Sequence, residues 1–103
     1  MSYGYIGSMK TRPGHRDEVV AILTRGAPAL RDIGCHAYIV ATATTDDQTI
    51  WVTEVWESAT HHDDSLQLPE VRAAIAEAMP LLTGEFSSQV CEVVGGIGAW
   101  TGA

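Results

Sequence analysis

The sequence predicts an α+β fold, and three observations support this prediction. Alternating apolar residues and turn-forming residues indicate four strands. Two other stretches carry apolar residues at intervals of three and four, which is the period of a helix. The length of 103 residues fits one domain. We therefore expect a single domain over residues 1–103, with a core at about 3–94 and a glycine-rich tail at 95–103.

The first part of the chain predicts a strand followed by a helix. The strand covers residues 3–11, and Pro13-Gly14 ends it. The helix runs to about Asp32 and ends at Gly34, because a glycine tolerates the backbone conformation that closes many helices. The residues predicted to share its apolar face are Val19, Ile22, Leu23, Ala27 and Leu30.

The middle of the chain predicts a hairpin. Residues 35–44 and 49–57 are rich in small, β-branched and aromatic side chains, which favour strands. The intervening Thr-Asp-Asp-Gln at 45–48 has the composition of a turn. The two strands are therefore expected to pair.

The last part predicts helices and a final strand. Ser58 can cap a short helix that carries two histidines, and Pro69 suits the first position of a longer one. The apolar stripe of the longer helix consists of Val71, Ala74, Ile75, Ala78 and Met79. Pro80 and Gly84 close the helical region before a strand at 86–94. The resulting order, β-α-β-β-α-β, predicts a ferredoxin-like fold: an antiparallel sheet with two helices on one face.

The predicted sheet is apolar on both faces. In the second hairpin strand, Ile50, Val52 and Trp56 alternate with Trp51 and Val55 on the opposite side. The two helices can cover one side only. We therefore expect a homodimer, in which a second copy covers the other side.

Charge and composition exclude several kinds of partner. Thirteen acidic and six basic residues give a net charge of −7, and the basic residues are scattered, so we expect no nucleic-acid and no membrane partner. The first ten residues lack the features of a signal peptide, and no apolar run is long enough to span a membrane, so we predict a cytoplasmic protein. Cys35 and Cys91 are expected to be buried, reduced thiols, without a disulfide or zinc site.

Several short motifs occur in a characteristic order. A Trp-Glu-Ser triplet at 56–58 ends a predicted strand, histidines at 61 and 62 follow, and a proline at 69 precedes the second long helix. Arg-Pro-Gly at 12–14 follows the first strand, and Gly-Cys-His at 34–36 precedes the second. With this order, the chain resembles the antibiotic biosynthesis monooxygenase family over about Tyr3 to Val94.

The resemblance implies a dimeric α+β barrel with an apolar cavity between helices and sheet in each subunit. Relatives include oxygenases that oxidise hydroquinones, polycyclic phenols or anthrones without metal, flavin or haem. We therefore expect a cofactor-independent monooxygenase that acts on a small phenolic, quinol or anthrone-like aromatic, with molecular oxygen as co-substrate. The alternative is a non-catalytic dimer that binds a small aromatic ligand or has a structural role.

The resemblance also suggests catalytic residues. Trp56 stands where such enzymes carry a tryptophan, and His62 stands where the polyketide-oxidising branch has a tyrosine. His62 is the candidate base or orienting group, and His61 is its substitute. Trp56 is a candidate cavity wall or hydrogen-bond donor. Val52 replaces an asparagine of that branch, so one polar substrate contact is missing.

Simpler interpretations exist for each of these residues. Trp56 can be a core residue only, and residues 61–64 can be a solvated helix turn. A metal site there is disfavoured, because neighbouring helical residues point about 100° apart. The resemblance also argues against haem degradation, because Gly7, Ser65 and Ile75 stand where the haem-degrading branch has an asparagine, a tryptophan and a histidine.

Other residues are candidates for substrate binding. Arg72 can recognise an anionic group, although a surface charge explains it more simply. Tyr5 lies on the same strand face as Tyr3, and the sequence does not decide whether that face meets the helices. The aromatic candidates for the cavity or the dimer interface are Tyr3, Tyr5, Tyr38, Trp51 and Phe86.

Overall fold

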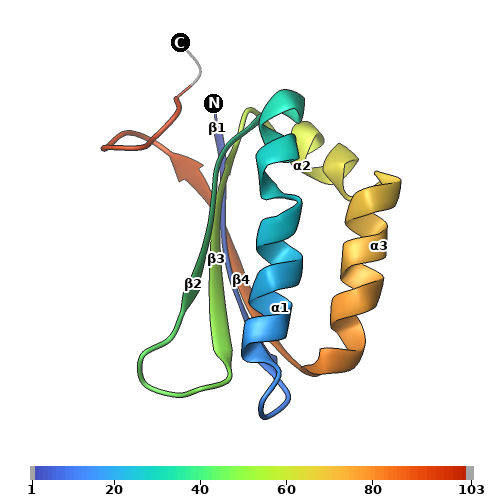
Figure 1. Cartoon of the computed structure of the whole chain (residues 1–103). Coiled ribbons are helices and arrows are strands. Elements are labelled where there is room, and N and C mark those ends of the chain that lie inside the picture. Colours follow the sequence, from blue (N-terminus) through green and yellow to red (C-terminus); the bar gives the residue numbers. More distant parts are fainter. Residues whose placement is uncertain (1, 102–103) are drawn as a thin grey trace.

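A computed structural model describes residues 2–101. Its elements are β1 (Ser2–Thr11), α1 (Arg16–Arg25), η1 (Ala27–Ile33), β2 (Cys35–Thr42), β3 (Thr49–Trp56), α2 (Ala59–Ser65), α3 (Pro69–Ala78), η2 (Met79–Leu81) and β4 (Leu82–Val93). The strands form one antiparallel sheet in the order β2-β3-β1-β4, and the helices lie on one face of it (Figure 1). The predicted α+β, ferredoxin-like fold is therefore confirmed. The predicted ends of the domain, residues 1 and 102–103, lie outside the described residues.

The core forms where α1 packs on the sheet. Val19 of α1 and Ile50 of β3 are fully buried, and Val52 and Leu82 belong to the same cluster. Ile50 and Val52 are two residues apart in β3, so both side chains point to the same side of the sheet, toward the helices. This contact identifies the face of the sheet that α1 covers.

The first helix ends earlier than predicted. The α-helix stops at Arg25, and residues 27–33 continue as a tighter 3₁₀ turn instead of reaching Asp32 as one helix. Pro28 explains the change, because a proline lacks the N–H that an α-helix requires and its ring clashes with the preceding turn. Gly34 ends the segment as predicted, with φ +101° and its N–H donating to the carbonyl of Leu30.

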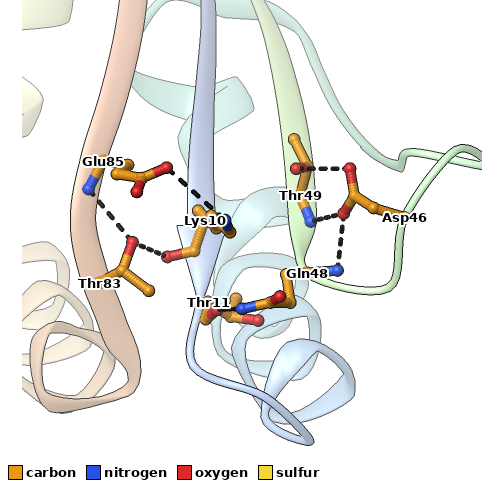
Figure 2. Close-up of polar contacts among 7 residues, drawn as sticks. All are labelled: Lys10, Thr11, Asp46, Gln48, Thr49, Thr83 and Glu85. Carbon is orange, nitrogen blue, oxygen red and sulfur yellow. Dashed lines mark hydrogen bonds and ion pairs between the residues drawn. The ribbon is translucent and has the colours of Figure 1, made fainter.

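The predicted hairpin is present, and Asp46 holds its turn. The carboxylate of Asp46 accepts hydrogen bonds from the backbone N–H groups of Gln48 at 2.8 Å and Thr49 at 2.7 Å (Figure 2). It also accepts one from the Thr49 hydroxyl at 2.9 Å. These bonds, with the Gln48 N–H first, lower the pKa of Asp46 below its ordinary value.

The last strand begins earlier than predicted. It starts at Leu82 instead of Phe86, and Gly84 lies within it rather than in a loop. Pairing of β4 with β1 shifts between Met9, opposite Phe86, and Thr11, opposite Leu82, so β4 contains extra residues that bulge. Gly84 has φ +93°, which suits a bulge, and the Thr83 hydroxyl donates to the carbonyl of Lys10 at 3.1 Å (Figure 2).

The face of the sheet away from the helices exposes large apolar side chains, as predicted for Trp51, whereas Val55, predicted on the same side, is buried. Ile6 is 40% exposed, Ile39 56% and Trp51 44%. The cross-strand register places Ile6 and Ile39 on either side of Thr53, so they share this face. We call this surface, with Trp51, the open face.

The described part of the tail, residues 94–101, forms bends and a turn and adds no strand to the sheet. It is anchored by Trp100, whose ring stacks on His36 with centroids 4.1 Å apart. Among the described residues, no helix is long and apolar enough to cross a membrane.

Candidate functional site

The helix-covered face of the sheet carries a row of three ionisable side chains. Glu54 of β3 lies directly opposite Tyr5 of β1 on one side and Tyr38 of β2 on the other. Directly opposite residues of an antiparallel pair point to the same face with Cβ atoms about 5 Å apart. Glu54 is two residues after Val52 in β3 and points to the same side, so this row faces the helices.

A second row lies next to the first, one step of the alternation further along β3. Trp56 is opposite Tyr3 of β1 and Cys35 of β2. The side chain of Trp56 is only 1% exposed. The question left open by the sequence is therefore answered: Tyr3 and Tyr5 both lie on the helix-covered face.

His62 of α2 covers both rows. Its ring centroid lies 5.0 Å from that of Tyr3 and 5.4 Å from that of Tyr5, with planes tilted by 31° and 24°. The Trp56 ring meets it edge-on, at 5.8 Å and 81°. Three aromatic rings and one imidazole therefore form a compact cluster, which we call the aromatic cluster.

The local structure of α2 decides which histidine joins this cluster. Ser58 is the N-cap, and its hydroxyl accepts the backbone N–H of His61 at 3.1 Å. The same hydroxyl lies 2.6 Å from Nδ1 of His61, so that imidazole is held at the cap. His61 also lies over Gly34, where a Cβ atom would come within 2.6 Å of its ring. His62, and not His61, therefore contacts the aromatic cluster.

The partner of His62 defines its tautomer. Nδ1 lies 3.0 Å from Oδ1 of Asp63, and the His62 side chain is 12% exposed whereas that of Asp63 is 71% exposed. A solvated carboxylate only accepts hydrogen bonds, so Nδ1 of His62 carries the hydrogen. Nε2 of a neutral His62 then carries a lone pair that can accept a proton.

A cavity of about 290 Å³ adjoins the first row. Its wall includes Tyr5, Tyr38, Val52 and Glu54, and it is completed by Gly7, Ser8, Met9, Phe86, Ser87 and Ser88. The volume lies near the lower end for small-molecule sites, about 300 Å³. The cavity therefore suits a small molecule with an apolar body and a polar group.

Gly7 makes room for Tyr5 in this wall. A Cβ atom at Gly7 would lie 2.9 Å from Cε1 of Tyr5, closer than such atoms approach. The missing side chain lets the phenol ring of Tyr5 lie along β1, over its own strand. The glycine thus has a local structural reason.

A second hollow, also of about 290 Å³, lies between η1 and β2. Arg31, Cys35 and His36 contribute to its wall, and Tyr38 is common to both cavities. It does not include Glu54 or Tyr5. We regard the first cavity as the candidate active site because it adjoins the row of Glu54.

The ionisable groups around the cavity are perturbed mainly by burial. Burial raises the pKa of Glu54, while the Trp56 indole and His62 act in the opposite direction. Nε1 of Trp56 donates to Oε1 of Glu54 at 2.8 Å. Burial, followed by the charge of Glu54, raises the pKa of Tyr38, and the same causes raise the pKa of Cys35 to about 11.

Comparison with known families and structures identifies the family. Residues 2–77 match the antibiotic biosynthesis monooxygenase family. The chain belongs to this family. A solved candidate antibiotic biosynthesis monooxygenase from Chloroflexus aurantiacus is 44% identical, with 93% of this chain and 96% of that chain covered and a TM-score of 0.80.

More distant solved structures share the fold. A candidate antibiotic biosynthesis monooxygenase from Caulobacter crescentus is 19% identical, with 91% of each chain covered and a TM-score of 0.83. A Mycobacterium tuberculosis protein is also 19% identical, with 94% of this chain and 99% of that chain covered and a TM-score of 0.80. At this identity the likeness concerns the fold alone. Comparison with curated proteins found no match.

The structure brings together some of the residues that the sequence suggested for this family's site. Tyr5 and Val52 line the cavity, and His62 contacts it through Tyr5. Trp56 lies behind the wall, with its N–H already donated to Glu54. Arg72 is exposed on α3 and does not line the cavity. Their functional roles stay predictions.

Sequence reasoning missed Glu54. The signal was present, because Glu54 is the charged member of an otherwise apolar series that alternates through Ile50, Val52 and Trp56. A carboxyl on a buried strand face costs free energy unless it has a partner or a function.

Among residues 2–101, no group of three or more His, Cys, Asp or Glu side chains is arranged to hold a metal ion.

Proposed function

We propose that the protein is a cofactor-independent monooxygenase that oxidises a small phenol, quinol or anthrone-like aromatic with molecular oxygen. The observation that supports this proposal is the composition of the cavity wall. Apolar Val52 suits an aromatic ring, while the Glu54 carboxyl and the Tyr5 phenol suit its hydroxyl groups. Membership of the family supports the same reaction class.

The proposed reaction needs no external reductant. A deprotonated phenol or anthrone is electron-rich enough to transfer an electron to oxygen, and the resulting radicals combine at carbon. When a CH₂ group becomes a carbonyl, one oxygen atom enters the product and the other leaves as water, so the substrate supplies all four electrons. The protein has to remove a proton, orient the ring and exclude water.

The aromatic cluster supplies groups for these tasks. His62 is the residue that the sequence suggests as base or orienting group, and its Nε2 has the lone pair that either role requires. Its stacking on Tyr5 couples it to the cavity wall. Loss of the imidazole would therefore disturb proton removal, ring orientation or both.

We also propose that two copies pair through the open face. Ile6, Ile39 and Trp51 are each at least 40% exposed there, and a protein partner is the usual cover for such a surface. A face-to-face arrangement of two sheets would complete the α+β barrel. Sedimentation at micromolar concentration tests this: a mass of about 11 kDa, that of one chain, would contradict the dimer.

Oxygen uptake with a panel of quinols, anthrones and naphthols tests the oxygenase. Chelator-treated protein should consume oxygen above the rate with heat-denatured protein, which corrects for autoxidation. His62→Ala should lose most of this uptake, by about 100-fold if the imidazole acts in proton transfer. His15→Ala is the matched control, because His15 is a half-exposed residue at the N-terminus of α1 and lines neither cavity.

The alternative function has a distinct signature in the same assay. A non-catalytic protein of this fold would bind members of the panel but show no protein-dependent uptake. Calorimetric titration under nitrogen measures this binding separately from turnover.

A further inference from the structure

Glu54 is the one acidic residue in the cavity wall as the structure describes it. Its two carboxyl oxygens have different surroundings. Oε1 accepts the Trp56 indole N–H at 2.8 Å, whereas no hydrogen bond to Oε2 occurs within residues 2–101. Oε2 is not fully buried either. Among these residues, the fully buried side-chain atom without a hydrogen-bond partner is Oγ1 of Thr11. Oε2 is therefore an unpaired acceptor that is not fully buried, on a side chain that is part of the cavity wall.

The carboxyl is held firmly in this position. Trp56 is fully buried and is bounded by the His62 ring, so the indole N–H that binds Oε1 cannot swing away. Tyr5 and Tyr38 flank Glu54 across the sheet. A preorganised acceptor of this kind loses little entropy when a ligand hydroxyl binds to it.

On the basis of the proposed function, we propose that Glu54 is the catalytic base, which binds the reacting hydroxyl of the substrate through Oε2 and accepts its proton. The step converts a phenol and a carboxylate into a phenolate and a carboxylic acid, so charge and atoms balance. The O–H bond of the substrate breaks, and an O–H bond forms on Glu54. Trp56 acts as a positioning residue, because it holds the opposite oxygen.

The position of His62 favours this division of roles. His62 does not line the cavity and contacts it through Tyr5, whereas Glu54 is part of the wall. A base has to lie within hydrogen-bond reach of the proton that it removes. His62 therefore orients Tyr5 and Trp56, and Glu54 contacts the substrate.

The burial of Glu54 also suits a general base. Burial raises its pKa, which brings its basicity closer to that of a phenolate, and general bases work best under such matching. The ionisable groups that face it are Tyr3 and Tyr5 on β1, Cys35 and Tyr38 on β2 and His62 on α2. The charge of His62 acts on the pKa of Glu54 in the opposite direction to burial.

The decisive variant is Glu54→Gln, which keeps an amide oxygen for the Trp56 indole N–H. With a substrate that the wild type turns over, we expect oxygen uptake to fall by about 100-fold or more, the usual contribution of a general base. The acidic limb of the wild-type pH profile should disappear. Glu54→Asp should restore part of the oxygen uptake and part of the acidic limb. Glu70→Gln, on the exposed first turn of α3, is the matched control and should leave uptake unchanged.

A second readout does not depend on turnover. Calorimetric titration with 1-naphthol under nitrogen should show wild-type affinity falling as the pH drops through the pKa of Glu54, because a protonated carboxyl accepts the hydroxyl poorly. The affinity of Glu54→Gln should not change over the same range. A variant that keeps wild-type uptake and its acidic limb would overturn the assignment of Glu54.

The two assays separate failure of this assignment from failure of the oxygenase. Active wild type with an equally active Glu54→Gln variant overturns the role of Glu54 alone. No uptake by the wild type overturns the oxygenase and, with it, a catalytic role for Glu54. In that case, a Glu54-dependent pH response of 1-naphthol binding would still support the contact between Oε2 and the ligand hydroxyl, and a flat response would overturn it.

Discussion

The two faces of the sheet are built from the same four strands but have different chemistry. The helix-covered face carries Glu54 and Trp56, whereas the open face carries Trp51, Ile6 and Ile39. On the covered face, burial perturbs ionisable groups and a cavity forms beside them. On the open face, apolar side chains stay exposed. Cover by helices therefore brings ionisable groups beside a cavity, and its absence leaves the surface through which we propose that two copies pair.

The two tryptophans of β3 provide the largest contrast between the faces. Trp56 is 1% exposed and Trp51 is 44% exposed, although they belong to the same strand. We expect Trp56→Ala to cost about 3–5 kcal/mol of unfolding free energy, because it empties a buried site. It also removes the hydrogen-bond donor of Glu54. Urea unfolding measures the loss, and a cost below that of Trp51→Ala would contradict this account.

A substitution on the open face should weaken the proposed dimer without disturbing the core. Trp51→Glu places a charge among Ile6 and Ile39 on this surface, and a hot-spot residue of an interface contributes at least about 2 kcal/mol. We expect the dimer dissociation constant to rise at least about 30-fold, while far-ultraviolet circular dichroism stays unchanged. Ala76→Glu, on an exposed position of α3, is the control. Equal sedimentation of both variants would argue against pairing through this face.

The two cysteines lie on different faces and should react with thiol reagents at different rates. Cys35 is buried on the covered face, as predicted, and its pKa is raised to about 11. The prediction that Cys91 is buried was wrong, because Cys91 lies opposite Gly4 on the open face and is exposed. At pH 8 we expect Cys35 to react with a thiol reagent at least about 30-fold more slowly than a free thiol, because the thiolate is the reactive form. Single Cys→Ser variants assign the rates. Dimerisation through the open face should also protect Cys91, which is measured by diluting the protein below the dissociation constant.

The smallest expected effect concerns the pH dependence of stability. The pKa of Glu54 is raised in the folded protein, so the folded state holds this proton more tightly than the unfolded state does. This contribution to stability is present below the ordinary carboxyl pKa and is lost as the pH rises through the folded pKa. Glu54→Gln should therefore gain stability relative to the wild type as the pH rises from the ordinary carboxyl pKa through the raised pKa of the folded state. A pH-independent difference in urea unfolding would show that the raised pKa is not linked to folding.

Much of the fold could be predicted from local patterns. The period of two along β3 placed Ile50, Val52 and Trp56 on one face, and the structure confirms this. Gly34 ends the first helical segment and Ser58 caps α2, as their side chains and backbone preferences indicated. The predicted continuous helix to Asp32 was wrong, because Pro28 tightens the last turns. The predicted start of the last strand at Phe86 was also wrong, because a bulge keeps Gly84 in the strand.

The sequence by itself determined the element order, the two apolar faces of the sheet and the family, because these follow from short-range periodicity and from motifs in order along the chain. Only the tertiary structure decided that Glu54 lies between Tyr5 and Tyr38 and that His62 covers this face. These four residues come from three different strands and a helix. They come together because of the strand register and because the hydrogen bonds of Ser58 hold His61 at the helix cap. Neither is a property of a local stretch of sequence.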